Sequence, residues 1–235
     1  MLLILFFCST AQAQEFWPGM EPYLQMTLGP EILQGEPVIH VNNLYRSPLV
    51  AVVYAYKCTE TEHGFHGTDD AAVNYSNPSR QGQTINIQSV WPGCTGRIMA
   101  AIWADGKELG DPAALRQFHD CRAVEQEEVH LALEEEIMKV PISQWDPAQS
   151  ITKLNTRRDS FPMHTTDVNA SEIQGCRTTE IYALTIDLED FQKTASQDPD
   201  KYALQRGRFL RFLKEMEQSL GSPTYPAAPF WWKGF

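Results

Sequence analysis

Hydrophobic and polar positions follow two different patterns along this chain, and the change falls near residue 111. Before it, short apolar or alternating runs are separated by turn residues, which is typical of β-strands. We expect strands at 38–43, 49–58, 84–87, 97–104 and 107–109. Several short strands at this spacing predict an α+β protein in which residues 22–111 form a small antiparallel, immunoglobulin-like β-sandwich.

The run LVAVVYAYKC at 49–58 is the clearest strand. It is almost continuously apolar and rich in β-branched and aromatic residues, so we expect a central strand covered on both faces. Asp105-Gly106, directly after the apolar run 97–104, is a strong hairpin signal and predicts a returning strand at 107–109.

Helical spacing begins at Asp111-Pro112, where Asp suits the N-cap and Pro suits the first helical position. The first helix is marked by a rough apolar stripe, interrupted between Glu125 and Glu128 and ended by Pro141: Leu115, Phe118, Cys121, Val124, Val129, Leu133 and Ile137. Residues 141–169 have little periodicity, and we expect an irregular connection there.

Two more helices complete the expected helical region, 112–220. The second covers about 171–196, with a buried face at Ile181, Leu184, Leu188 and Phe191. The third starts at Asp198-Pro199 and ends at Gly221, with a buried face at Tyr202, Phe209, Leu213, Met216 and Leu220.

Charge is divided unequally between the first and third of these helices. Residues 112–139 carry seven acidic and three basic side chains, and residues 199–220 carry three acidic and five basic ones. One interpretation is that the two helices lie side by side with complementary charge; the other is two independent solvated faces.

The N-terminus predicts export. The apolar run from Leu2 to Cys8 is followed by small residues at Ala11 and Ala13, which suit a signal peptide at 1–13 and a mature start near Gln14. No Lys or Arg precedes the run, so the usual basic segment is missing, and the run is too short to span a bilayer. We expect a periplasmic or extracellular protein.

Four cysteines remain after the signal peptide: Cys58, Cys94, Cys121 and Cys176. Their long spacings disfavour zinc-ribbon and thioredoxin-type sites, so we expect two disulfides. Antiparallel pairing of the two apolar strands would make Cys58 and Cys94 neighbours, and Cys121 and Cys176 would join the first helix to the second. Free buried cysteines are the alternative for a chain that stays in the cytosol.

A net charge of −11 disfavours nucleic acid and anionic membranes as partners, since both require a basic surface. The candidate metal ligands are His63, His66, Asp69 and Asp70. Residues three apart on a strand point to opposite faces, so a site there needs an irregular loop. The alternative is an ordinary exposed hairpin tip.

Other chemistry-bearing residues suggest structural roles. His119 and His130 lie about 16 Å apart along one helix, too far to share an ion. Glu134, Glu135 and Glu136 fan around the same helix, which is typical of a solvated face. The sequence contains no G-x-S-x-G, H-E-x-x-H, Walker or G-x-G-x-x-G motif, and we expect no catalytic residues and no cofactor.

The last fifteen residues, GSPTYPAAPFWWKGF, combine prolines and aromatics without periodicity. Phe230, Trp231 and Trp232 would not remain bare in water, so this tail at 221–235 either covers exposed core or docks a protein or carbohydrate partner.

LVAVVYAYKC and AAIWADGKELGDPAALRQFHDCR, the latter at 100–122, resemble a group of uncharacterised secreted bacterial proteins. These have a short β-domain, an "ADG…GDP" junction and a helix with an Arg-rich start. Where those proteins have two consecutive arginines after the junction, this chain has Cys121-Arg122. The resemblance implies export and architecture, and no activity.

Together these features predict an exported, non-catalytic binding or structural protein. The alternative is a secreted metal-dependent hydrolase using His63, His66 and Asp69. A third possibility is a docking module that acts through the aromatic tail.

Overall fold

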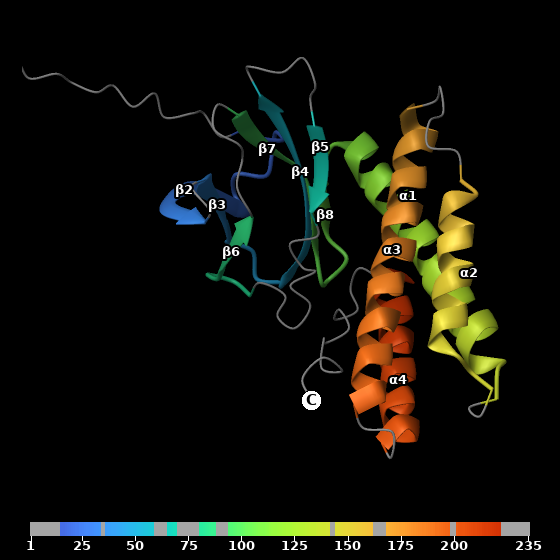
Figure 1. The fold of residues 1–235 in the computed structure, drawn as a ribbon. Coiled ribbons are helices and arrows are strands. Elements are labelled where there is room, and N and C mark those ends of the chain that lie inside the picture. Colours follow the sequence, from blue (N-terminus) through green and yellow to red (C-terminus); the bar gives the residue numbers. More distant parts are fainter. Residues whose placement is uncertain are drawn as a thin grey trace, which may run out of the picture.

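The computed structural model has mixed α+β architecture, with strands between residues 15 and 110 and helices from 112 to 221. It describes residues 15–33, 36–58, 65–69, 80–87, 94–141, 144–161, 168–197 and 201–221. Figure 1 shows the strands gathered on one side of the molecule and the helices on the other, with the start of α1 beside the strands. The expected division into a strand part and a helical part is therefore present.

The strands form two small sheets. The first has the order β1 (Glu15–Phe16), β7 (Cys94–Trp103), β4 (Leu49–Cys58), β5 (Phe65–Asp69), and β8 (Glu108–Gly110) also pairs with β7. The second has the order β2 (Leu24–Leu33), β3 (Glu36–Asn43), β6 (Thr84–Ile87). All pairs are antiparallel except β1 with β7, which is parallel.

Strand β4 is covered on both faces, as its apolar sequence predicts. Leu49 and Val52 belong to a core that also contains Leu24 of β2 and Val41 of β3. A second core contains Val50, Ala51 and Val53 together with residues of β7 and α1: Ala100, Ile102, Ala114 and Phe118. One core therefore joins the two sheets, and the other joins the first sheet to the helices.

The hairpin predicted at Asp105-Gly106 is also present. The Gly106 amide donates to the Trp103 carbonyl at 2.9 Å, and Gly106 has φ +82°. After the short strand β8, Gly110 has φ +136°, and a Cβ there would collide with the backbone of Met99 and Ala100. A side chain at position 110 is therefore excluded where the chain passes from β8 into the first helix.

Within the described residues, four α-helices and one π-helical segment follow: α1 (Pro112–Leu131), its π-helical continuation η2 (Ala132–Met138), α2 (Pro147–Asp159), α3 (Val168–Gln197) and α4 (Tyr202–Gly221). The predicted cap of the first helix is confirmed, because the Asp111 carboxylate accepts the Ala113 amide at 3.0 Å. Helix α3 covers the predicted second helix, and α4 covers the predicted third helix from Tyr202 onward. The predicted start at Asp198-Pro199 lies outside the described residues. All four residues predicted for the α3 buried face lie in one helical core.

The expectation of an irregular connection over 141–169 is wrong, because α2 lies within it. Asp146 caps this helix by accepting the Ala148 amide at 3.0 Å, and Pro147 takes the first helical position. This is the same Asp-Pro signal as at Asp111-Pro112, and its meaning was missed because α2 has few apolar residues. Leu154 of α2 and Trp145 before the helix are buried in the main helical core, and Ile151 packs against it while partly exposed.

Helices α1 and α4 lie side by side, as one interpretation of their charges predicts. His130 of α1 contacts Glu217 of α4, with 2.7 Å between Nδ1 and Oε1. The basic partners that other helices supply to acidic residues of α1, however, are Arg157 from α2 and Arg177 from α3, and Arg122 of α1 itself pairs with Glu125. Complementary charge on α1 is therefore supplied by α2 and α3.

Candidate functional site

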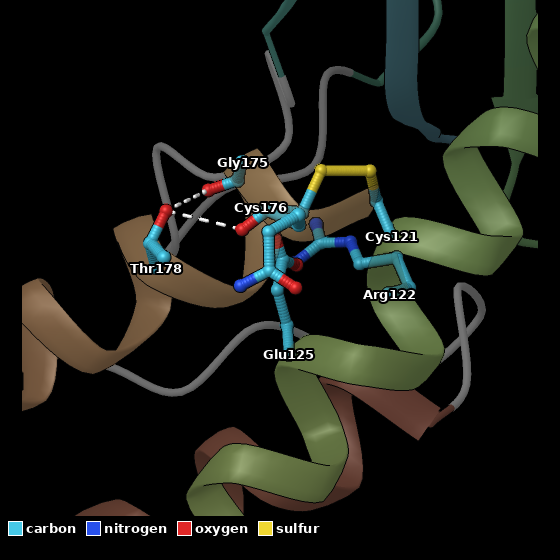
Figure 2. The surroundings of a disulfide bond; sticks show 7 residues. Cys121, Arg122, Glu125, Gly175, Cys176 and Thr178 are labelled. Atoms are coloured by element: carbon cyan, nitrogen blue, oxygen red, sulfur yellow. Dashed lines mark hydrogen bonds and ion pairs between the residues drawn. A yellow bond between two sulfur atoms is a disulfide. The ribbon is translucent and has the colours of Figure 1, made fainter. Parts of the chain in front are cut away.

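A disulfide between Cys121 and Cys176 joins α1 to α3, with 5.5 Å between the Cα atoms. This confirms the pairing predicted from the placement of the cysteines on the first and second helices. Figure 2 shows Arg122 and Glu125 of α1 close to the bridge, and the Thr178 hydroxyl donating to the Gly175 carbonyl on the α3 side. The bridge therefore marks a helix interface that is lined by charged residues.

Beside the disulfide, three charged groups lie largely out of water: Arg122, Glu125 and Glu180. Arg122 is 3.6 Å from Glu125, measured from its terminal nitrogen to Oε2. Glu180 is 9% exposed, and its Oε1 is buried without a hydrogen-bond partner. An unpartnered buried carboxylate oxygen is unfavourable, because the charged form has lost its hydration.

This environment changes the acidity of all three groups. Burial first, and then the negative charge of Glu125, raise the pKa of Glu180 to about 8 from its ordinary 4.5, and Arg122 opposes them. Burial also raises the pKa of Glu125 despite the nearby Arg122. The pKa of Arg122 is lowered by burial, which outweighs its attraction to the two carboxylates. Both carboxyl groups are therefore shifted toward their protonated forms, and Glu180 reaches a pKa of about 8.

A second cluster lies further along the same interface, around the fully buried carboxylate of Glu128. Arg157 donates to it from two nitrogens, Nε at 2.6 Å and Nη2 at 2.9 Å, and Arg177 Nε lies 3.4 Å away. Arg177 also donates to Glu127 at 2.7 Å. Both guanidinium groups lie over the Phe161 ring, at 5.6 and 5.4 Å from its centroid. Glu128 thus links α1 to both α2 and α3.

We refer to these residues, with the disulfide, as the charged seam: Cys121, Arg122, Glu125, Glu127, Glu128, Arg157, Cys176, Arg177 and Glu180. Apart from the cysteines, no member was predicted as a site residue. The available signal was the interruption of the apolar stripe between Glu125 and Glu128. Acidic residues at positions that continue a buried stripe indicate paired or protonated carboxylates, in addition to the alternative of an exposed turn of helix.

The candidate metal ligands are placed only in part. His63 and Asp70 lie outside the described residues. His66 and Asp69 lie in β5, where the register pairs them with Ala55 and Val52 of β4. The expected irregular loop is therefore replaced by a strand over Phe65–Asp69, because this segment pairs with the edge of β4. The side chains of His66 and Asp69 lie outside the description, so metal binding stays a prediction.

The other predicted disulfide has the backbone arrangement that it requires. Strands β4 and β7 are antiparallel, and their register pairs Cys58 directly with Cys94. The side chains of both cysteines lie outside the description, so the Cys58–Cys94 bond stays a prediction.

The remaining predicted residues are not brought together. His119 contacts Glu108 at 2.9 Å, whereas His130 contacts Glu217, so the two histidines have different acidic partners. Glu134 lies in η2, and the side chains of Glu135 and Glu136 are not described. The tail residues Phe230, Trp231 and Trp232 lie outside the described residues.

Sequence reasoning also missed an aromatic trio in the strand part: Tyr23, Tyr45 and Trp103. Their ring centroids lie 5.5 to 6.0 Å apart. The Lys107 ammonium lies 3.8 Å from the Tyr23 centroid and 4.9 Å from that of Tyr45. The chain's own lysine thus occupies the cation position, which favours a structural role.

Polar contacts connect this trio to the neighbouring turns. The Trp103 indole donates to Asn43 Oδ1 at 3.0 Å, and the Tyr45 hydroxyl donates to Asp105 at 3.0 Å. Loss of hydration raises the pKa of Asp105, but hydrogen bonds from the Lys107 amide and the Tyr45 hydroxyl outweigh it and leave that pKa below its ordinary value. These contacts hold the β7–β8 hairpin against the segment after β3.

The described part of the chain contains no group of three or more His, Cys, Asp or Glu side chains arranged to hold a metal ion. None of the helices described is both long and apolar enough to cross a bilayer. No family model matches the chain, and neither a curated protein nor a solved structure matches it.

Proposed function

We propose that this chain is an exported, non-catalytic binding or structural protein, held in shape by disulfides. The Cys121–Cys176 bond carries this proposal. Disulfides persist in oxidising compartments and are rare in the cytosol of most organisms. The bond lies between two helices and beside buried charges, where it fixes the spacing of those helices. A periplasmic or extracellular location is compatible with it.

The order of the strands supports an immunoglobulin-like sandwich for the strand part. An immunoglobulin fold places strands A, B and E in one sheet and strands G, F and C in the other, and some members add a strand beside C. In this chain β2, β3 and β6 form one sheet, and β8, β7, β4 and β5 are neighbours in the other. Buried residues from both sheets share one core, as a sandwich requires.

The test of export uses the full chain, produced in a host with a functional secretion pathway. We expect N-terminal sequencing of the secreted protein to begin at Gln14. We also expect Cys121 and Cys176 to be recovered as a linked peptide from a non-reducing digest. Cytosolic protein with an intact N-terminus and freely alkylated cysteines would overturn the proposal.

The aromatic tail is the part of this proposal that concerns a partner. We propose that residues 222–235 either cover the folded core or bind a protein or carbohydrate. Deleting them separates the two roles. If the shortened protein unfolds, the tail is part of the core; if it keeps its stability but loses a ligand bound by the full chain, the tail is a binding segment.

A further inference from the structure

The charged seam contains an arrangement that the sequence pattern alone does not show. Helices α1 and α3 run in the same direction in Figure 1, and the disulfide joins Cys121 of one to Cys176 of the other. Four residues further along each helix, about one turn, stand Glu125 and Glu180. One helical turn beyond the disulfide, each helix therefore carries a carboxylic acid. The negative charge of Glu125 acts on Glu180.

The groups around this acid pair do not neutralise it fully. On α1, Arg122 lies 3.6 Å from Glu125, and it is attracted to both Glu125 and Glu180. Glu128 and Asp187 add further negative charge that acts on Glu180.

The two arginines that other helices contribute to the charged seam bind carboxylates outside this acid pair. Arg157 of α2 is bonded to Glu128, and Arg177 of α3 is shared between Glu127 and Glu128. On α4, the acidic Glu217 is bonded to His130. One guanidinium therefore faces two carboxyl groups: that of Glu125, which is partly buried, and that of Glu180, which is buried and has an oxygen without a hydrogen-bond partner.

We propose that the Glu125–Glu180 pair is a proton-binding site that controls how closely α1 and α3 pack beside the disulfide. With one proton bound, the pair and Arg122 together are neutral, and the carboxyl group can remain buried. When that proton passes to water, two carboxylates share one buried cation and repel each other. The helices then separate locally and admit water, while the disulfide one turn away limits the movement.

The direction of the pH dependence follows from the raised pKa of Glu180. The pKa of Glu180 is about 8 in the folded protein and near its ordinary 4.5 in the unfolded chain. The folded state therefore binds the proton more tightly, and the resulting stability is fully present below pH 4.5. It decreases as the pH rises from 4.5 to about 8, and it does not decrease further above that.

The experiment compares the oxidised protein with its Glu180→Gln variant, since glutamine has the shape of the protonated acid but cannot lose the proton. Urea unfolding is followed by circular dichroism from pH 4.5 to 9. We expect the two proteins to be similar near pH 4.5, and the variant to have the higher midpoint at pH 8.5. Glu189→Gln, at an exposed position of the same helix, should follow the original protein at every pH.

A second measurement reports on the interface itself. The rate at which a phosphine reduces the Cys121–Cys176 bond is measured for both proteins, and their ratio cancels the pH dependence of the reagent. We expect a ratio near one at pH 5, with the original protein reduced several-fold faster at pH 8.5. We expect Glu125→Gln also to be reduced more slowly than the original protein at pH 8.5. This variant replaces Glu180→Gln in the experiment if Glu180→Gln does not fold.

Two results would overturn the proposal: a constant stability difference between the proteins at all pH values, or reduction rates whose ratio does not change with pH. Neither result would affect the proposed function, because export and disulfide formation do not depend on the proton. Conversely, failure of the export test would leave the acid pair in place.

Discussion

At the scale of single residues, the molecule contains more buried charge than its sequence pattern indicates. Glu128 has no exposed side-chain surface, yet Arg157 and Arg177 supply its partners from two other helices. A buried ion pair of this kind adds little net stability compared with apolar residues of similar size. Removing the carboxylate or its guanidinium partner, however, leaves the other charge without compensation. The main effect of the ion pair is to specify which helices meet at this point.

Replacing Glu128 with alanine tests this description. We expect a loss of about 2–3 kcal/mol in the free energy of unfolding, below the roughly 3–5 kcal/mol of a fully buried pair, because the Arg157 side chain is 37% exposed. Urea denaturation measures the change. Glu127→Ala, which removes a 53% exposed carboxylate bonded to Arg177, should cost under about 1 kcal/mol. Equal losses in the two variants would contradict the role given to burial.

At the scale of elements, the helices owe their starting points to a repeated local signal. Asp followed by Pro begins both α1 and α2, and in each case the carboxylate accepts the amide two residues later. The Asp-Pro signal is local, so it predicts a helix start even where the apolar pattern is weak. For α2 it predicts the helix better than the apolar pattern does, because that helix contributes few residues to the core.

The importance of this cap can be measured at Asp146. We expect Asp146→Ala to lower the free energy of unfolding by about 1 kcal/mol, since the Ala148 amide loses its acceptor. The matched variant is Asp159→Ala at the opposite end of α2, where an exposed acid is unfavourable to the helix dipole. Thermal unfolding of both variants measures the difference: the midpoint should fall in Asp146→Ala and should stay the same or rise slightly in Asp159→Ala. A larger loss at Asp159 than at Asp146 would refute the capping argument.

The elements that could be predicted are those whose signal lies within one segment. Strand β4 and strand β6 have the expected bounds, and α3 and α4 follow their apolar stripes. Strand β5 was missed because its assignment depends on pairing with β4, which the local sequence does not encode. The charged seam was missed for a related reason: Glu180 and Glu125 are 55 positions apart, and only the packing of two helices brings them together.

At the scale of the whole molecule, the first sheet lies between two apolar cores and connects the second sheet to the helices. One face packs on the second sheet, and the other packs on the start of α1 through Ala114 and Phe118. The main helical core is a separate cluster and contains residues from α1, η2, α2, α3 and α4. The contact around Phe118 is therefore the apolar connection between the strand part and the helical part in the described residues.

Weakening that connection should change the cooperativity of unfolding as well as the stability. Phe118 is 4% exposed, and Phe118→Ala is expected to cost about 3–5 kcal/mol. The near-ultraviolet signal of aromatic residues in the strand part and the far-ultraviolet signal of the helices should then no longer change at the same urea concentration. Leu115→Ala, at a partly buried neighbour, should cost less and leave the two transitions together. Coincident transitions in Phe118→Ala would show that other contacts couple the two parts.

The covalent link between α1 and α3 also affects what proteolysis can do to this protein. Cys121 and Cys176 are separated by 55 positions, and α2 lies within that interval. A single peptide-bond cleavage there produces two polypeptides that stay attached. On an electrophoresis gel, such a nicked molecule should run as one band without reductant and as two bands with it. Outside the cell, where proteases are abundant, the bridge would therefore keep a cleaved protein in one piece.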